Sequence, residues 1–116
     1  MAREPNPNFM AGVPELLVLR LLQDREMYGY EIVQSIKTET ANVISFGEGV
    51  VYPLLHNLEQ EGAVTSRRKQ VGGRSRVYYT LTAKGVRRYQ QLAQTWTSLA
   101  DAIQSALKGV RHAPEL

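Results

Sequence analysis

Residues 47–62 read GEGVVYPLLHNLEQEG, and this stretch decides the fold. Apolar side chains recur at i, i+3, i+4 and i+7, which predicts one buried helix face: Val51, Leu54, Leu55 and Leu58. The opposite face carries hydrogen-bonding groups: Tyr52, His56, Asn57 and Gln60. A helix with a packed inner face and a hydrogen-bonding outer face suits DNA recognition. An ordinary amphipathic helix explains the segment about equally well.

The ends of this helix are marked by cap residues. Ser45, three residues before Glu48, predicts a capping box, and Gly62 should close the far end. Pro53 lacks a backbone N–H, so the regular helix should either begin near residues 49–51 or be kinked there.

Two helices are expected before it. The first should begin near residues 10–14, after a loose arm at 1–9. Its core, LLVLRLL at 16–22, is apolar almost all round, which predicts that a second subunit covers part of it, including Leu16 and Leu19. The second helix opens at YGYEI, residues 28–32, and its predicted buried stripe consists of Tyr30, Ile32, Val33 and Ile36. With a tight turn before the third, these helices form a helix-turn-helix.

Residues 63–82 are expected to form a β-hairpin wing. Strand-like runs at 64–70 and 75–81 flank Gly72-Gly73, a dipeptide that favours a tight hairpin turn. The runs and their tip carry five bases: Arg67, Arg68, Lys69, Arg74 and Arg76. Charges on an edge strand also block strand addition. Five bases without an acid exceed that need, so contact with phosphates is favoured.

A long helix is predicted over residues 83–110, with Thr82 as its N-cap and a tail at 111–116. Its apolar residues alternate in steps of three and four, the seam of a coiled coil: Val86, Tyr89, Ala93, Trp96, Ala100, Ile103, Leu107 and Val110. About 27 helical residues reach ~40 Å, beyond a domain of this size. The expected partner is the same helix of a second copy, with Tyr89, Trp96, Ile103 and Leu107 at the interface.

Composition limits the function classes. The 116-residue chain is long enough for one domain, and it contains no cysteine, which excludes disulfides and cysteine-ligated metals and fits a cytoplasmic location. No apolar run is long enough to span a membrane. Residues 1–61 carry four Lys/Arg and nine Asp/Glu, whereas residues 62–116 carry ten and two. This asymmetry suggests a surface for a polyanion.

Three stretches together resemble the PadR-type winged-helix transcriptional regulators: YGYEI at 28–32, VYPLLHNLEQEG at 51–62, and GG at 72–73 followed by YYTLTAKG at 78–85. The single C-terminal helix is similar to the family's smaller subgroup. The resemblance implies an α+β winged helix-turn-helix and a homodimer that binds a double-stranded operator, usually as a repressor. In some members a flat aromatic effector, bound at the dimer centre, releases the DNA.

This sequence departs from the family at two positions. Val50 stands where Thr is frequent, and Asn57 stands where a base is frequent, so the third helix carries three Glu and no Lys or Arg. We therefore expect the wing to hold the phosphate backbone while neutral groups read bases. Asn57 suits an adenine edge and His56 a guanine, and Tyr52 could equally contact a phosphate. The remaining candidate DNA contacts are Tyr30, Gln34 and Gly49.

Trp96 is the only tryptophan and lies midway along the seam, between Ala93 and Ala100. These small neighbours either let two indoles pack or leave a gap between subunits that accepts a planar aromatic guest. A metal site is not expected, because His56 and Glu59 supply only two ligands, and no cofactor motif or nucleophile indicates an enzyme. The alternative function is a winged-helix dimer that binds proteins and no specific DNA.

Overall fold

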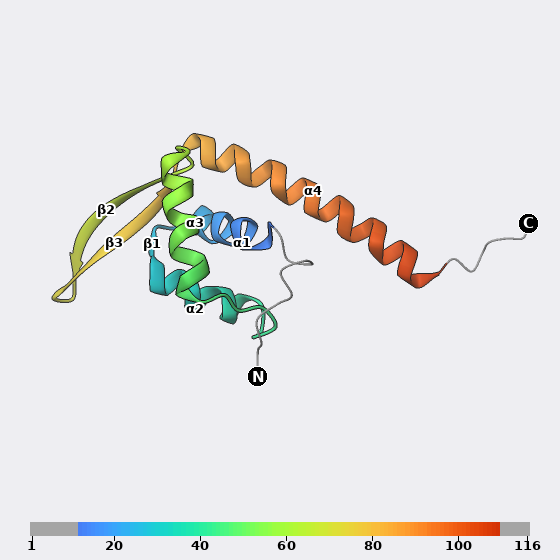
Figure 1. The fold of residues 1–116 in the computed structure, drawn as a ribbon, viewed down its shortest axis with the longest axis horizontal. Coiled ribbons are helices and arrows are strands. Elements are labelled where there is room, and N and C mark those ends of the chain that lie inside the picture. Colours follow the sequence, from blue (N-terminus) through green and yellow to red (C-terminus); the bar gives the residue numbers. More distant parts are fainter. Residues whose placement is uncertain (1–11, 110–116) are drawn as a thin grey trace, which may run out of the picture.

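The computed structural model describes residues 12–109, in which helices and strands follow the order shown in Figure 1. Their bounds are α1 Val13–Asp24, β1 Met27–Tyr28, α2 Gly29–Glu39, α3 Glu48–Gln60, β2 Val64–Val71, β3 Arg74–Leu81 and α4 Ala83–Lys108. The predicted fold, a winged helix-turn-helix followed by a long helix, is confirmed. The predicted arm at 1–9, the tail at 111–116 and Val110 lie outside the described residues.

α1, α2 and α3 pack around one hydrophobic core, and the sheet adds Val64 and Tyr79 to it. Leu19, Ile32 and Leu55 lie at its centre with no exposed surface. Within residues 12–109 no polar or charged side chain is buried. Burial of apolar surface therefore holds the three helices together.

Tyr30 is a correction to the predicted stripe of α2. Ile32, Val33 and Ile36 are buried as predicted, but Tyr30 is 50% exposed. At 3.6 residues per turn, Tyr30 is about 200° around the helix from Ile32, so it points away from the core. This position leaves the Tyr30 ring on the surface beside the start of α2.

The start of α3 differs from the predicted capping box. α3 begins at Glu48, and its N-cap is Gly47, without a side-chain cap. The Gly47 carbonyl accepts the N–H groups of Val50 and Val51, each at 3.1 Å. Ser45 therefore lies too far upstream to cap the helix, and Glu48 occupies the first helical position. Pro53 lies inside the helix, in its second turn, where it removes one intrahelical hydrogen bond.

The end of α3 is a Schellman motif, in agreement with the predicted role of Gly62. The Ala63 N–H donates to the Leu58 carbonyl at 2.8 Å, and the Gly62 N–H donates to the Glu59 carbonyl at 3.0 Å. Gly62 has a φ of +79°, which a residue with a side chain rarely adopts. The chain consequently reverses within two residues and enters β2.

The sheet has three strands in the described range, in the order β1-β3-β2. β2 and β3 pair antiparallel from Val64↔Leu81 to Val71↔Arg74, and Gly72 and Gly73 form a two-residue turn with φ values of +59° and +78°. Positive φ at both turn residues matches the right-handed twist of the strands, and it confirms the predicted hairpin.

β1 was not predicted. No strand was expected before the second helix, but Met27 is buried and pairs with Tyr79, and Tyr28 pairs with Tyr78. A strand of two residues has no periodicity of its own, and its partner lies about fifty residues away. β1 joins the wing directly to the start of α2.

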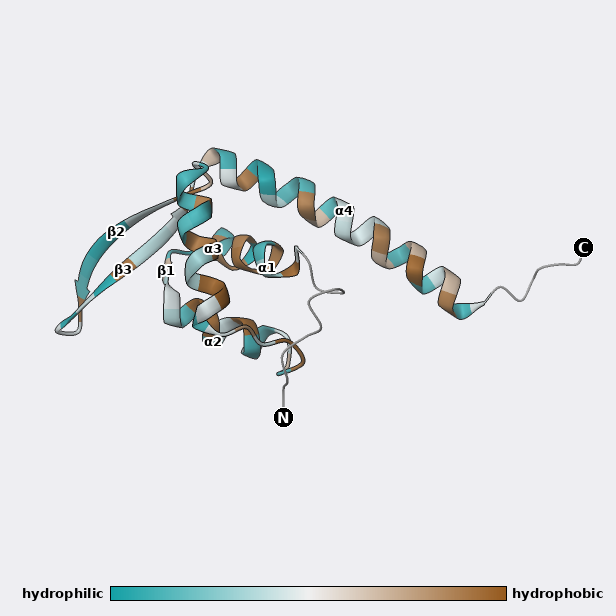
Figure 2. Ribbon diagram, in the orientation of Figure 1, coloured by the Kyte–Doolittle hydropathy of each residue, from teal (hydrophilic) through white to brown (hydrophobic). Residues whose placement is uncertain are grey.

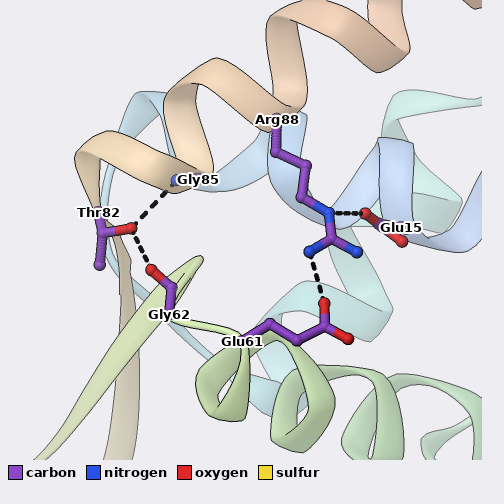
Figure 3. A network of polar contacts seen from close by, with 6 residues as sticks. All are labelled: Glu15, Glu61, Gly62, Thr82, Gly85 and Arg88. Carbon is purple, nitrogen blue, oxygen red and sulfur yellow. Dashed lines mark hydrogen bonds and ion pairs between the residues drawn. The ribbon is translucent and has the colours of Figure 1, made fainter.

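The start of α4 is fixed to the end of α3 (Figure 3). The Thr82 hydroxyl accepts the Gly85 N–H at 3.1 Å, which confirms the predicted N-cap, and it donates to the Gly62 carbonyl at 2.6 Å. One turn further on, Arg88 pairs through Nε with Glu15 of α1 and through Nη1 with Glu61 after α3, both at 2.5 Å. These two hydrogen-bonded carboxylates raise the pKa of Arg88, Glu15 more than Glu61. α1, α3 and α4 are therefore linked by a single side chain.

The two halves of α4 have different surroundings. Tyr89 and Leu92 in the first half pack against the core, and the second half extends away from the rest of the protein (Figure 1). Figure 2 shows that apolar residues continue along this projecting part. Trp96 is 47% exposed, and Leu107 is 79% exposed. An apolar seam is therefore open to solvent in the single chain.

We expect Gly85→Ala to lower the free energy of unfolding by about 1–3 kcal/mol. A Cβ at Gly85 would lie 2.1 Å from the Ala63 carbonyl oxygen, so backbone has to move. Gly49→Ala is the matched control, because nothing lies within 4 Å of a Cβ there and alanine favours a helix. Urea unfolding followed by circular dichroism measures both. Equal stability of the two variants would contradict the close packing at Gly85.

Candidate nucleic-acid interface

The outer face of α3 carries the predicted hydrogen-bonding side chains at the surface. Tyr52, His56 and Asn57 are exposed, and they follow one another at helical spacing. Gly49 lies exposed in the first turn of the same helix, whereas Gln34 of α2 is half-buried. α3 therefore offers neutral donors and acceptors, with its acidic residues at the two ends.

Tyr52 is held against the first turn of α2. A Cβ built at Gly29 would lie 1.9 Å from Cε1 of Tyr52, so the ring occupies the space that any other residue would need at position 29. Burial, and secondarily the charge of Glu48, raises the pKa of the Tyr52 phenol. Its hydroxyl is therefore protonated at neutral pH and able to donate a hydrogen bond.

A groove of about 500 Å³ separates α3 from the wing. Six of the predicted DNA contacts line it: Tyr30, Tyr52, His56, Arg68, Arg74 and Arg76. Residues that were not predicted complete its lining: Tyr28, Gly29, Ser75, Val77 and Tyr79. The groove combines guanidinium groups with aromatic rings and has no acid among its lining residues.

The wing bases have different partners. Arg68 donates to the Ser75 hydroxyl at 3.3 Å, and the Arg76 guanidinium lies 4.3 Å from the centroid of the Tyr28 ring. Within residues 12–109 Arg74, at the turn, makes no ion pair. These three arginines therefore keep their charge available to a ligand in the groove.

Arg67 and Lys69 are paired with an acid of the same chain. Both pair with Glu26, which precedes β1: Lys69 in a close contact, and Arg67 at 3.6 Å. Neither Glu26 nor Tyr28 was predicted as a site residue, because the pairing of β1 with the wing brings them to this surface and β1 was not predicted. The sequence signal available for this contact was the i, i+2 spacing of Glu26 and Tyr28, together with the Tyr78-Tyr79 pair of the later strand.

The predicted effector and dimer residues lie apart from this groove, on α4. Ala93 and Ala100 are half-buried on either side of the exposed Trp96, and Ile103 and Leu107 are exposed further along. Leu16 of α1 keeps some exposed surface. Leu19 keeps none, because it lies in the core of its own chain, so we remove it from the candidate interface.

The described part of the chain holds neither a metal-binding cluster nor a membrane-spanning helix. No group of three His, Cys, Asp or Glu side chains that could hold a metal ion occurs among residues 12–109. No helix in this range is both long enough and apolar enough to cross a membrane.

Comparison with known proteins identifies the family. The model of the PadR-like family of transcriptional regulators matches residues 18–91, which extend from α1 through the wing into α4. The chain belongs to the PadR-like family. Membership makes it a transcriptional regulator, and the matched range contains α3, the groove and all five wing bases.

Several transcriptional regulators match over most of their length. A PadR-like transcriptional regulator from Bacillus cereus is 27% identical with a TM-score of 0.78, covering 89% of this chain and 99% of its own. A transcriptional regulator structure from Clostridium thermocellum is 26% identical with a TM-score of 0.78, covering 87% and 96%. The Mycobacterium tuberculosis transcriptional regulator Rv3488 is 28% identical over 104 residues, 90% of this chain and 92% of its own.

Proposed function

We propose that this PadR-like regulator binds a double-stranded DNA operator through α3 and the wing. The observation that carries the proposal is the groove between them, which is lined by three arginines, several tyrosines and exposed neutral residues of α3. Arginines favour phosphates, and neutral hydrogen-bonding groups suit base edges. In this proposal the DNA-binding domain is the segment predicted at 10–82, and α4 is the dimerisation helix predicted at 83–110.

The two elements divide the work. α3 enters the major groove, where Asn57 pairs with adenine, His56 with guanine, and Gly49 and Gln34 lie near the backbone. Tyr52 and Tyr30 flank the phosphates, and Arg68, Arg74 and Arg76 hold the backbone beside the wing. As a repressor, the bound protein would cover the operator and exclude other proteins from it.

We expect Arg68→Ala with Arg74→Ala to weaken binding to operator and random DNA alike. Each lost phosphate contact should flatten the slope of log K against log salt by about 0.9. Asn57→Ala is the matched variant on α3, and it should weaken operator binding by ~1–3 kcal/mol while sparing random DNA. Fluorescence anisotropy over a salt series, on duplexes selected from the source genome, measures both.

These variants also separate DNA binding from the rival function. A winged-helix dimer that recognises only proteins would show no salt-dependent binding to any duplex. A double arginine variant with the wild-type salt slope would remove the wing from the interface.

The proposed regulator works as a homodimer held by α4. The exposed apolar seam beyond Ala93 supports the homodimer. An apolar seam of this length is expected to be covered by a partner helix and not to remain exposed to water. Leu16 of α1 and Tyr89 of α4, both partly exposed, are proposed to extend this contact.

We expect Ile103→Glu with Leu107→Glu to convert the dimer into a monomer, because four carboxylates cannot be buried in one seam without partners. Light scattering and sedimentation measure the mass. Gln104→Glu with Ser105→Glu is the control, since it adds the same two charges to exposed positions beside Ile103 but outside the seam. A dimer that persists in the seam variant would locate the interface elsewhere.

Release from DNA is proposed to follow binding of a planar aromatic effector between two Trp96 side chains. The small Ala93 and Ala100 on either side would leave room beside each indole, and Trp96 is 47% exposed in the single chain. A guest at this position would change the angle between the DNA-binding domains and lower operator affinity.

Trp96 is the only tryptophan, so its fluorescence reports on this site directly. We expect a panel of planar aromatic dyes and phenolic acids to include compounds that quench it saturably and lower operator affinity. Trp96→Ala should abolish their binding, which calorimetry measures without the indole. Absence of saturable quenching across the panel, or unchanged binding to Trp96→Ala, would reject the effector site.

A further inference from the structure

Glu26 is an acid facing a surface that is otherwise basic. It lies in the connection between α1 and β1, one residue before the first strand. Its carboxylate pairs with Lys69 through Oε2 and with Arg67 through Oε1 at 3.6 Å. The contact crosses more than forty residues of sequence, and it places an acid of the helical body against two bases of the wing.

Strand pairing puts all three charged side chains on one face of the sheet. Arg67 pairs with Tyr78, Tyr78 pairs with Tyr28, and side chains two residues apart share a face. Glu26, two residues before Tyr28, joins them on this face. The neighbouring residue Ser66 points to the other face, where its hydroxyl donates to Glu59 near the end of α3 at 2.7 Å.

Lys69 is held along the sheet by two contacts. Its ammonium binds Glu26 and lies 4.6 Å from the centroid of the Tyr78 ring, which packs edge-to-face on Tyr28. Only 29% of the Lys69 side chain is exposed. A phosphate must therefore replace both the carboxylate and the ring to recruit this lysine.

Arg67 is held less firmly. Its side chain is 68% exposed, and only Glu26 neutralises it among the described residues. The hydrogen bond from Lys69, followed by the charges of Lys69 and Arg67, keeps the pKa of Glu26 below its ordinary value in spite of partial desolvation. Glu26 is consequently ionised at neutral pH and competes with phosphates for both bases.

We propose that Glu26 is an internal counter-ion that occupies Arg67 and Lys69 and so limits the sequence-independent attraction of the wing for DNA. The inference rests on the proposed function and concerns the regulation of that same surface. Arg68, Arg74 and Arg76 supply the phosphate contacts of the wing. Glu26 keeps Arg67 and Lys69 from making further phosphate contacts. Removing the Glu26 carboxylate, without altering α3, makes the charges of Arg67 and Lys69 available to phosphates.

Glu26→Gln keeps the size of the side chain and removes its charge. We expect it to raise affinity for a random-sequence duplex about two- to fivefold, the range that an exposed ion pair can supply. The slope of log K against log salt should steepen, by up to ~0.9 for each base that gains a phosphate. Anisotropy on a labelled random duplex over a salt series measures both quantities.

Two matched variants make the test specific. Glu39→Gln changes the net charge equally, but Glu39 lies at the exposed end of α2 and makes no ion pair within residues 12–109. Arg67→Ala with Lys69→Ala removes the two bases that Glu26 pairs with. Glu26→Gln should tighten binding more than Glu39→Gln does, and in the background without the two bases this excess should vanish.

Each other result overturns the proposal. Equal effects of Glu26→Gln and Glu39→Gln would show that only net charge matters. Weaker binding by Glu26→Gln, with an unchanged melting temperature, would make Glu26 a residue that orients the wing for DNA. Failure of the proposed function looks different, because the wild-type protein itself would then show no salt-dependent binding to duplex DNA.

Discussion

The architecture depends on one close contact between backbones, where Gly85 of α4 lies against the Ala63 carbonyl. The left-handed Gly62 turns the chain out of α3 at this point, and Thr82 bridges its carbonyl to the first turn of α4. The end of α3, the base of the wing and the start of α4 therefore meet within a few residues. No apolar contact could place three elements so closely, because side chains would keep their backbones apart.

Charge is arranged so that position on the protein determines what each base can do. α3 has acids at its ends and no bases between them, so the DNA contact proposed for it would have to come from shape and hydrogen bonds. The wing carries the positive charge, yet part of it is already balanced by Glu26. A count of Lys and Arg therefore overstates the attraction of this surface for a polyanion.

The sequence predicted the features that depend on local patterns. The α3 face, the Gly-Gly turn, the Thr82 cap and the length of α4 all follow from spacing or from one residue's backbone preference. It missed β1, which depends on a distant partner in β3, and it placed Tyr30 in the buried stripe although helical spacing puts this ring on the opposite side from Ile32. Six of the eleven predicted DNA contacts line the groove, and the pairing of Arg67 and Lys69 with Glu26 needed the register of the sheet.

The 26-residue α4, anchored at one end and projecting at the other, has the geometry of a lever. At 1.5 Å per residue it is about 39 Å long, so a tilt of roughly 5° at its base displaces the far end by about 3 Å. One base pair along B-DNA is also about 3.4 Å. If the far end is held, the same tilt moves α3 by nearly the rise of one base pair, so small rotations at Arg88 and Gly85 would be enough to shift the proposed DNA-binding face by that step.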